Sequence, residues 1–362
     1  MGTSKRNPGS QCLAADDPGQ KEDPHKKRIN KLSDYRQTAI DTITEIKKIT
    51  SSDDPYWMDV LKPIHSCSNY LSFRHFFEIS SDYQRVYPDQ PKLYQVFTCK
   101  RHLICPVCAL LRQQRLHRRL LPIIEQILNE NSDLKAYHLT LTVKNQKDLL
   151  PAFNTLIHGL RDRFTVRRRQ RTSKRYKKHT EFSKIEGAIY AVEVTRGKKA
   201  KLWHPHIHMM ILCKDKPYVL NNKELYKSGL MFTPELLPAG SLNYEWYNLT
   251  GGIQVNLDEI KATEGDILFN LLCEVVKYGI KPGELCTKDI MTVYSNLSGK
   301  RLLGTIGNLR GVKIPDAGPD EDIPDTENFD EYFYKFLNGA GYIQQSKTTY
   351  AILKSGGRAG VC

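Results

Sequence analysis

The stretch HPHIHMM, which runs from His204 to Met210, decides how the fold is read. Its apolar residues are typical of a strand that is buried in a sheet. Because side chains alternate between the two faces of a strand, His206 and His208 project from the same face, close enough for both imidazoles to bind one metal ion. We therefore predict a buried strand with two metal ligands. The alternative is a pair of buried histidines that bind no metal.

A carboxylate in the preceding segment completes this candidate metal site. Residues 185–195 and 206–212 have the composition of strands, and the basic connection between them suits an antiparallel hairpin. Glu193 is the carboxylate of the segment AIYAVEVT and reaches the histidine face if the hairpin pairs in this way. Since divalent ions such as Mg²⁺ and Mn²⁺ favour oxygen ligands, we predict Glu193 as the third ligand. The alternative is a glutamate exposed at a strand end.

Other segments of the chain alternate between strand and helix patterns. Strands are predicted over residues 138–143 and 253–257, and helices over residues 110–128, 148–164 and 263–280.

One stripe of the helix predicted over residues 263–280 carries reactive groups. Glu274, Tyr278 and Lys281 lie at positions i, i+4 and i+7, on one side of the helix. The other side is apolar and consists of Leu268, Leu272, Val275 and Val276. Taken alone, this pattern is also that of an ordinary surface stripe.

The histidine pair and the tyrosine together indicate phosphoryl-transfer chemistry. A divalent ion on His206 and His208 would hold a scissile phosphate while the Tyr278 hydroxyl attacks the phosphorus. The products would be a 5′-phosphotyrosyl link and a free 3′-OH. Because a free tyrosine has a pKa of about 10, it needs a polarised phosphate or a nearby base. Glu274 is placed to activate water when the link is resolved.

The order of these motifs resembles that of the HUH endonucleases. HLTLT, HPHIHMM and EVVKYGIK follow one another as the three motifs of that family do. The glutamate four residues before the tyrosine resembles the pattern in the rolling-circle plasmid replication initiators that use a single catalytic tyrosine. The resemblance covers about residues 137–281. It implies an α+β fold of the HUH endonuclease type, in which helices pack on an antiparallel sheet with the histidines on a central strand.

The resemblance also implies roles for single residues. His206 and His208 would bind Mn²⁺ or Mg²⁺, with Glu193 as a further ligand from a neighbouring strand. Tyr278 would nick the origin and Glu274 would support hydrolysis at termination. Lys281, the last residue of the ExxxYxxK motif, is included in the catalytic group.

Four of the nine cysteines form a candidate structural zinc site. Cys105 and Cys108 are separated by two residues, a spacing with which two thiolates can chelate one tetrahedral Zn²⁺. Cys67 and Cys99 lie upstream, and a Cys₄ site made of all four resembles the cysteine pattern that precedes the nuclease motifs in several initiators. His102 is a competing fourth ligand, and four cysteines without metal are the alternative.

The net charge of +14 is unevenly distributed along the chain. Residues 161–184 contain eleven Lys and Arg against two acidic residues, whereas residues 315–331 contain eight acidic residues and no basic one. The basic run includes aromatic residues and indicates contact with DNA phosphates, with strong salt dependence. The predicted DNA-binding residues are Arg167, Arg168, Arg169, Arg171, Lys174, Arg175, Lys177 and Lys178. A solvated loop is the alternative for the basic run, and a linker is predicted for the acidic one.

The composition suggests four successive parts. Residues 1–55 are predicted as a largely disordered polar arm with one helix over residues 35–49, and residues 56–130 as a zinc-binding module with a basic helix. Residues 135–310 are predicted as the HUH nuclease domain with a basic insertion near residues 161–184. Residues 311–362 are predicted as an acidic linker and C-terminal segment. Within the last part, residues 331–337 are predicted to be helix-like.

The sequence also predicts where the protein acts. No segment approaches the roughly 18 uninterrupted apolar residues of a membrane span, and the N-terminus lacks the apolar region of a signal peptide. The chain is therefore expected to be soluble and cytoplasmic, with no membrane partner.

The resemblance implies an initiator of plasmid rolling-circle replication, a sequence-specific single-strand DNA endonuclease and ligase whose partner is single-stranded or hairpin origin DNA. Since the sequence has no GxxxxGK[ST] phosphate loop, a host helicase is expected to unwind the duplex. The alternatives are an HUH transposase or relaxase with the same chemistry, and a non-catalytic zinc-dependent DNA-binding regulator. The oligomeric state is not predicted.

Overall fold

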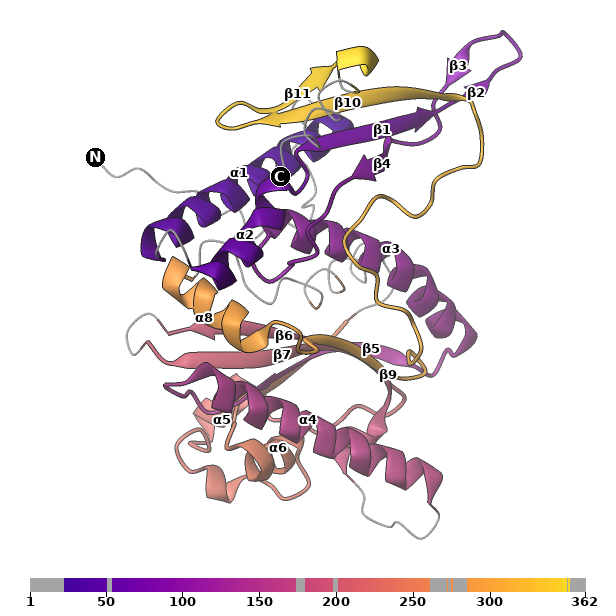
Figure 1. The fold of residues 1–362 in the computed structure, drawn as a ribbon. Coiled ribbons are helices and arrows are strands. Elements are labelled where there is room, and N and C mark those ends of the chain that lie inside the picture. The colour runs from indigo at the N-terminus through magenta and orange to yellow at the C-terminus, as the bar shows by residue number, and fades with distance from the viewer. Residues whose placement is uncertain are drawn as a thin grey trace. The chain divides into compact units, whose positions relative to one another are not determined.

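The computed structural model describes residues 23–50, 54–173, 180–197, 201–260, 272, 275, 285–349 and 351. These residues form two compact units (Figure 1). Unit 1 comprises the described residues of Leu116–Ile314, and unit 2 comprises those of Leu13–Arg115 and Pro315–Cys362.

Unit 1 contains a five-stranded sheet in the order β8-β5-β7-β6-β9, and all neighbouring strands are antiparallel. Its strands are β5 (Lys135–Thr142), β6 (Ile185–Arg196), β7 (Trp203–Cys213), β8 (Val255–Glu259) and β9 (Leu303–Gly307). β7 is the central strand and carries the histidines, as predicted. The antiparallel α+β architecture that the sequence predicted is therefore confirmed for this unit.

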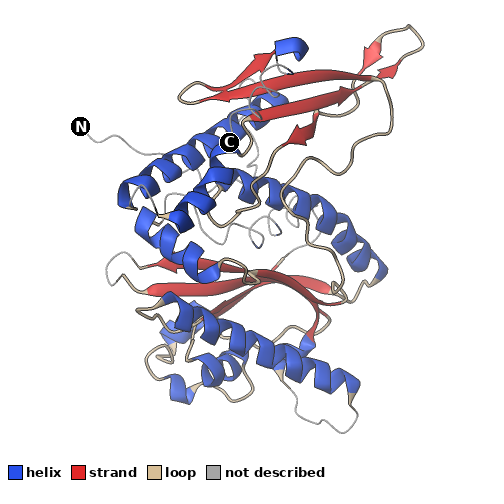
Figure 2. Cartoon of the chain, in the orientation of Figure 1, coloured by secondary structure: helices blue, strands red, loops and turns tan. Residues whose placement is uncertain are grey.

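Helices cover both faces of this sheet (Figure 2). The helices of unit 1 are α4 (Leu149–Thr172), α5 (Asn222–Lys227), α6 (Leu242–Thr250), α8 (Thr287–Leu297) and the part of α3 (Pro106–Glu130) from Leu116 onward, with 3₁₀ turns at η1 (Glu181–Lys184) and η2 (Pro234–Leu236). α4 packs on one face, where the ring centroids of Phe164 and Tyr190 are 5.7 Å apart. α6 lies against α4, since a Cβ atom on Gly159 of α4 would lie 3.1 Å from the Trp246 ring.

The opposite face of the sheet holds the core that matters for the site. Leu116, Leu120 and Ile124 of α3 pack there against four strand residues, which are Ala136, Ile189, Met210 and Leu212. In the strand register Ala136 pairs with Leu212 and Ile189 pairs with Met210, so these residues share one face. That face is also the face of His206 and His208, because side chains at even spacing along β7 point the same way.

Two residues of the segment predicted as a helix over residues 263–280 are described. Leu272 and Val275 are helical and fully buried in the same core cluster as Met210. Both belong to the side of that helix predicted to be apolar, and their burial confirms this part of the pattern.

Unit 2 is built on a second antiparallel sheet in the order β11-β10-β1-β4. Its strands are β1 (Tyr70–Phe76), β4 (Lys92–Val96), β10 (Phe329–Leu337) and β11 (Gly341–Gln345), and β2 (Glu78–Ile79) pairs with β3 (Arg85–Val86) as a separate ribbon. The helices are α1 (Pro24–Ile49), α2 (Pro55–Ser66) and the first residues of α3. α1 packs on this sheet, where the Ser33 hydroxyl accepts a hydrogen bond from the Tyr342 backbone N–H at 2.9 Å.

The helix predicted over residues 35–49 is confirmed, but the predicted disorder is wrong for the rest of the described residues 23–50. They form α1, whose first turn is capped by the Asp23 carboxylate at 3.0 Å from the His25 N–H. Its buried face is formed by Ile29, Leu32, Tyr35, Arg36, Ala39, Ile43 and Ile46. Charged residues between the positions of this stripe make the segment look polar in the sequence, and most of them lie on the other side of the helix.

The predictions for the C-terminal part are also wrong. Residues 331–337, expected to be helix-like, belong to the strand β10, which pairs with β1 on one side and β11 on the other. The acidic segment is not a solvated linker, because its carboxylates pair with cations of the same unit. Asp320 is 6% exposed and accepts both guanidinium N–H groups of Arg28 at 2.9 Å. Asp322 and Asp330 pair with Lys92 and Arg85.

The predicted strands 138–143, 185–195, 206–212 and 253–257 and helices 110–128 and 148–164 correspond to β5, β6, β7, β8, α3 and α4 apart from their ends. α3 is longer than predicted and continues through Pro122. α4 extends to Thr172, so the first part of the predicted basic insertion is helical. No helix within the described ranges has the length and apolar character needed to cross a bilayer.

Candidate metal centres

The register of β6 and β7 brings three metal-ligating side chains together. Glu193 lies directly opposite His206, and Ala191 lies opposite His208, so the carboxylate and both imidazoles share one face of the sheet. Glu193 Oε2 is 3.3 Å from His206 Nε2 and 3.0 Å from His208 Nε2. We call Glu193, His206 and His208 the β7 triad.

The β7 triad has the donor set and spacing of a divalent-cation site. Its ligand atoms lie within 4.8 Å of one another. Neighbouring ligands of an octahedral ion with bonds of about 2.1 Å lie roughly 3.0 Å apart, close to the separations in the triad. Glu193 is 3% exposed, and a carboxylate buried to this degree needs compensating partners. The triad can therefore hold a metal ion.

The hydrogen bonds behind the histidines orient them toward Glu193. His206 Nδ1 lies 3.2 Å from the backbone oxygen of His204, and because a carbonyl only accepts, Nδ1 carries the proton and Nε2 keeps its lone pair. His208 Nδ1 instead faces side chains of β5, with His138 Nε2 at 3.2 Å and Thr140 Oγ1 at 3.4 Å. His204 is not part of the triad, and burial lowers its pKa.

The four predicted zinc ligands also converge, in unit 2. Cys67 follows α2, Cys99 follows β4, and Cys105 and Cys108 lie at the start of α3. The Sγ–Sγ distances are 3.5 Å between Cys67 and Cys108, 3.4 Å between Cys99 and Cys108, and 3.7 Å between Cys105 and Cys67. A tetrahedral site with Zn–S bonds of about 2.3 Å has sulfur atoms roughly 3.8 Å apart, so the cluster fits such an ion.

The thiols of this cluster influence one another's ionisation. Hydrogen bonds from Cys105, Cys108 and Cys67 lower the pKa of Cys99. The pKa of Cys105 is raised by the hydrogen bonds with Cys108, Cys67 and Cys99 and then by its complete burial. The four thiols therefore do not ionise together on their own, and a bound cation would supply the charge that lets several of them act as thiolates.

His102, the competing fourth ligand, is engaged elsewhere. Arg112 Nη1 donates to His102 Nε2 at 2.6 Å, and the group of mutually close ligand atoms contains the four cysteines and not His102. Burial, and then the charge of Arg112, lowers the pKa of His102 to about 4. The imidazole is therefore a neutral hydrogen-bond acceptor at neutral pH.

The three predicted catalytic residues, Glu274, Tyr278 and Lys281, lie outside the described residues. Leu272 and Val275, which lie on either side of Glu274 in the sequence, are described. Both are buried beside Met210, two positions along β7 from His208 and on the same face. The structure thus locates these two residues on the face of the sheet that carries the β7 triad.

The basic residues divide into structural and exposed groups. Arg167 was predicted to bind DNA, but the structure places it inside the protein. It is 9% exposed, and its guanidinium donates to the backbone oxygens of Ile185 and Glu186. Burial lowers its pKa to about 10. Arg171 is exposed but pairs with Glu186 through both Nη atoms at 2.6 and 2.7 Å.

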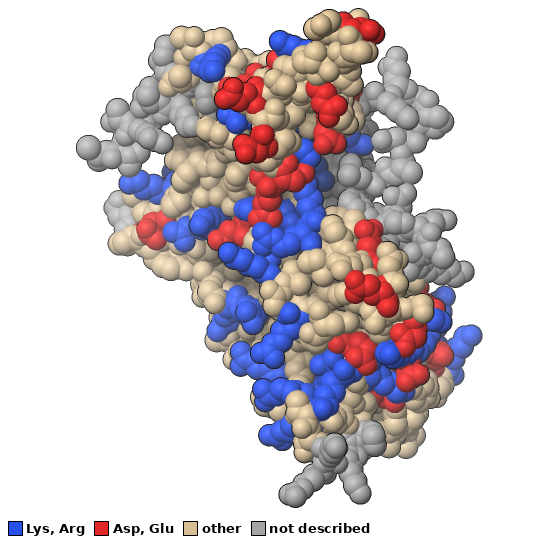
Figure 3. All heavy atoms as spheres, turned by 90° about the vertical axis from the view of Figure 1, so that its right-hand side faces the viewer, with Lys and Arg blue, Asp and Glu red and all other residues tan. Residues whose placement is uncertain are grey.

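Arg168 and Arg169 are exposed on α4, whereas Lys174, Arg175, Lys177 and Lys178 lie outside the described residues. On the face in Figure 3, Lys and Arg side chains gather over unit 1 near the C-terminal end of α4, with acidic residues among them.

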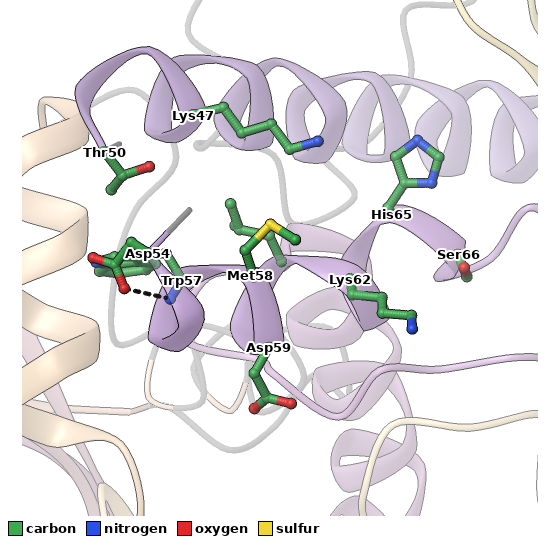
Figure 4. A pocket seen from close by; sticks show the side chains of 10 residues that line it. Lys47, Thr50, Asp54, Trp57, Met58, Asp59, Lys62, His65 and Ser66 are labelled. Atoms are coloured by element: carbon green, nitrogen blue, oxygen red, sulfur yellow. Dashed lines mark hydrogen bonds between the residues drawn. The ribbon is translucent and has the colours of Figure 1, made fainter. Parts of the chain in front are cut away.

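A separate cavity of about 710 Å³ lies in unit 2 between α1 and α2 (Figure 4). Its lining is largely apolar, with Trp57 and Met58, and Lys47, Lys62 and His65 also line it. None of the described cysteine or histidine metal ligands lines it.

The fold and the two donor sets define an α+β protein in which an antiparallel sheet carries a carboxylate–histidine centre and a second unit carries a four-cysteine centre. The Replication protein family matches residues 90–333, which is 244 of the 362 residues. The chain therefore belongs to the Replication protein family.

Curated relatives agree with this membership. The chain is similar to "Protein rep" of Bacillus amyloliquefaciens, with 26% identity over 79% of this chain and 81% of the relative. It is also similar to "Protein rep" of a Bacillus species, with 27% identity over 74% of this chain and 84% of the relative. A third relative is "Protein rep" of Streptococcus pneumoniae, with 27% identity over 61% of this chain and 64% of the relative. No solved structure matches the chain.

The lowered pKa of His102 gives a testable prediction. A histidine with an ordinary pKa titrates at about 6.5, whereas His102 should stay neutral until the pH falls to about 4. Because the unfolded chain takes up this proton first, the stability contributed by neutral His102 is present above about pH 6.5 and is lost as the pH falls toward 4. Histidine NMR titration, with the resonance assigned by His102→Gln, measures it. A midpoint near 6.5 would contradict the burial and the Arg112 contact.

Proposed function

We propose that this chain is an initiator of plasmid rolling-circle replication, a sequence-specific single-strand DNA endonuclease and ligase. The observation that carries the proposal is the β7 triad on a sheet face that also buries Leu272 and Val275. Tyr278 follows Val275 by three residues. Membership of a replication protein family supports replication as the process.

The proposed reaction transfers a DNA strand to the protein. Glu193, His206 and His208 would hold Mn²⁺ or Mg²⁺. When bound, the ion would act as a Lewis acid on the scissile phosphate. The Tyr278 oxygen would bond to the phosphorus as the bond to the 3′ oxygen breaks. The tyrosine proton would leave and the 3′ oxygen would take one up, which gives a 5′-phosphotyrosine and a 3′-OH primer.

The reverse and final steps would use the same groups. A free 3′-OH that attacks the phosphotyrosine would rejoin the strand and release Tyr278. Glu274, four residues before the tyrosine, would accept a proton from water when the link is hydrolysed. Lys281 would stabilise the negative phosphate oxygens as a positive charge on the same sequence stripe.

DNA would bind through phosphate contacts along unit 1. Arg168 is exposed and, with Arg310, lines a hollow of about 360 Å³ at the edge strand β9. Arg169 and the basic residues 174–178 would extend this contact. Arg167 is excluded from it because its guanidinium is used inside the protein. Such binding should weaken steeply with salt.

The cysteine cluster would hold a structural Zn²⁺. The sulfur spacing supports four-coordinate zinc, and the ion would join α2, β4 and α3, which are distant in the sequence. Origin DNA would be the partner and a host helicase would open the duplex, both in the cytoplasm.

A transposase or relaxase of the HUH type would use the same triad and tyrosine. The carboxylate four residues before Tyr278 favours the initiator, because an initiator must end its reaction by hydrolysis. A non-catalytic zinc-dependent regulator would need neither the buried carboxylate between two histidines nor the tyrosine motif.

The nucleophile can be tested by covalent capture. Single-stranded oligonucleotides tiled from the source replicon should give a Mn²⁺-dependent protein–DNA adduct on denaturing gels, and Tyr278→Phe should abolish it. Tyr226→Phe, which changes a tyrosine 63% exposed on α5, is the control and should keep the adduct. An adduct that persists in Tyr278→Phe would refute the assignment of the nucleophile.

The role of Glu274 separates the initiator from the other HUH enzymes. Glu274→Ala should leave the first cleavage within a few-fold of wild type, and should slow hydrolytic release by about 10²-fold or more, since a general base is lost. Single-turnover cleavage and decay of the isolated adduct measure the two steps, with Glu130→Ala as a control on α3. Unchanged release would favour the transposase or relaxase.

Metal analysis tests the cysteine cluster. Protein purified without chelator should contain about one equivalent of zinc, and Cys105→Ser should lose it together with stability. Cys286→Ser, at an exposed cysteine outside the cluster, should retain it. Less than about half an equivalent in the wild type would rule out a resident zinc ion.

A further inference from the structure

The two histidines of the β7 triad are held from behind in different ways. His206 Nδ1 bonds a backbone oxygen, a partner that no substitution at that position removes. His208 Nδ1 faces side chains of the neighbouring strand β5. The orientation of His208 therefore depends on which residues the sequence places on β5.

His138 supplies the closer of these contacts. Its Nε2 lies 3.2 Å from His208 Nδ1, and the two rings are stacked with their centroids 5.3 Å apart and 23° between their planes. Thr140, which pairs directly with His208 in the register, is 3.4 Å away. His138 is therefore in position both to bond Nδ1 and to limit rotation of the His208 ring.

We propose that His138 is a positioning residue, which holds His208 with its proton on Nδ1 and its Nε2 lone pair directed at the divalent ion. The inference rests on the proposed metal site and deepens it. A metal-bound Nε2 carries no proton, so Nδ1 must carry one and needs an acceptor. Neutral His138 accepts it at Nε2 while its own proton sits on Nδ1.

His138 suits this role because its ring nitrogens can exchange donor and acceptor roles. His208 Nε2 lies 3.0 Å from Glu193 Oε2 and, without an ion, can donate to it, in which case Nδ1 becomes an acceptor. His138 can then donate from Nε2 by changing its tautomer. One partner therefore satisfies His208 both with and without the ion.

The test is Mn²⁺ affinity, measured by electron paramagnetic resonance on purified protein without DNA. His138→Phe keeps an aromatic ring but removes the nitrogen, and should weaken Mn²⁺ binding about 10–100-fold. His138→Gln restores an acceptor and should recover most of the affinity. His158→Phe, an exposed histidine on α4, is the matched control and should bind as wild type does.

A second readout reports the tautomer itself. In long-range ¹H–¹⁵N spectra with Mg²⁺ bound, His208 of the wild type should be the Nδ1–H form, and His138→Phe should show a mixture of both forms. Unfolding temperatures of all variants show whether the change at His138 acts through stability, and His138→Gln keeps the test valid if His138→Phe does not fold.

The outcomes separate this inference from the proposed function. If the wild type has no Mn²⁺ site that His206→Ala removes, the metal site itself fails. If the site exists and His138→Phe binds Mn²⁺ with wild-type affinity and tautomer, the inference is overturned. If His138→Gln is as weak as His138→Phe in a folded protein, hydrogen bonding by His138 is also refuted.

Discussion

The constraint on which the candidate site depends is a carboxylate buried between two imidazoles. Burial of Glu193 is unfavourable unless charge or hydrogen bonds offset it. His208 Nε2 at 3.0 Å can donate to this carboxylate, whereas the lone pair of His206 Nε2 at 3.3 Å calls for a cation between the two atoms. The antiparallel register of β6 and β7 produces this arrangement, because it sets Glu193 opposite His206. A register shift of one residue would turn the carboxylate to the other face.

The rest of unit 1 keeps this arrangement in place. The apolar residues that follow the histidines on the same face, Met210 and Leu212, pack under α3 and beside Leu272 and Val275. The packed core is thus continuous with the metal-binding face, and it includes Leu272 and Val275, which precede Tyr278 in the sequence. Unit 2 is held together by other contacts. Four cysteines from separate elements meet at one point, and carboxylates of the acidic C-terminal segment pair with Arg28 and Lys92.

Sequence reasoning succeeded where the relevant contacts are local. The hairpin of β6 and β7 connects neighbouring strands, so alternation and the turn predicted that Glu193 joins His206 and His208. The spacing of Cys105 and Cys108 likewise indicated a chelating pair. Sequence reasoning missed His138, although the sequence contains a signal for it. Alternation along HLTLT puts His138 on the same side of β5 as Thr140, which pairs with His208.

The errors at β10 and Arg167 concern contacts between segments that are separated in the sequence. β10 pairs with β1 in the register Phe73↔Tyr332, and nothing in an acidic stretch specifies a partner so far away in the chain. The aromatic alternation within β10 is a strand signal that the neighbouring charges obscured. Arg167 was taken for a surface cation because its acceptors, the backbone oxygens of Ile185 and Glu186, carry no side-chain signature.

The central claim is that the β7 triad binds a divalent ion, and anomalous diffraction from crystals soaked in Mn²⁺ tests it most directly. The account predicts a manganese peak within bonding distance, about 2.2 Å, of Glu193, His206 and His208, and its loss in His206→Ala crystals. A fully occupied manganese site elsewhere, with no peak between these three side chains, would contradict it.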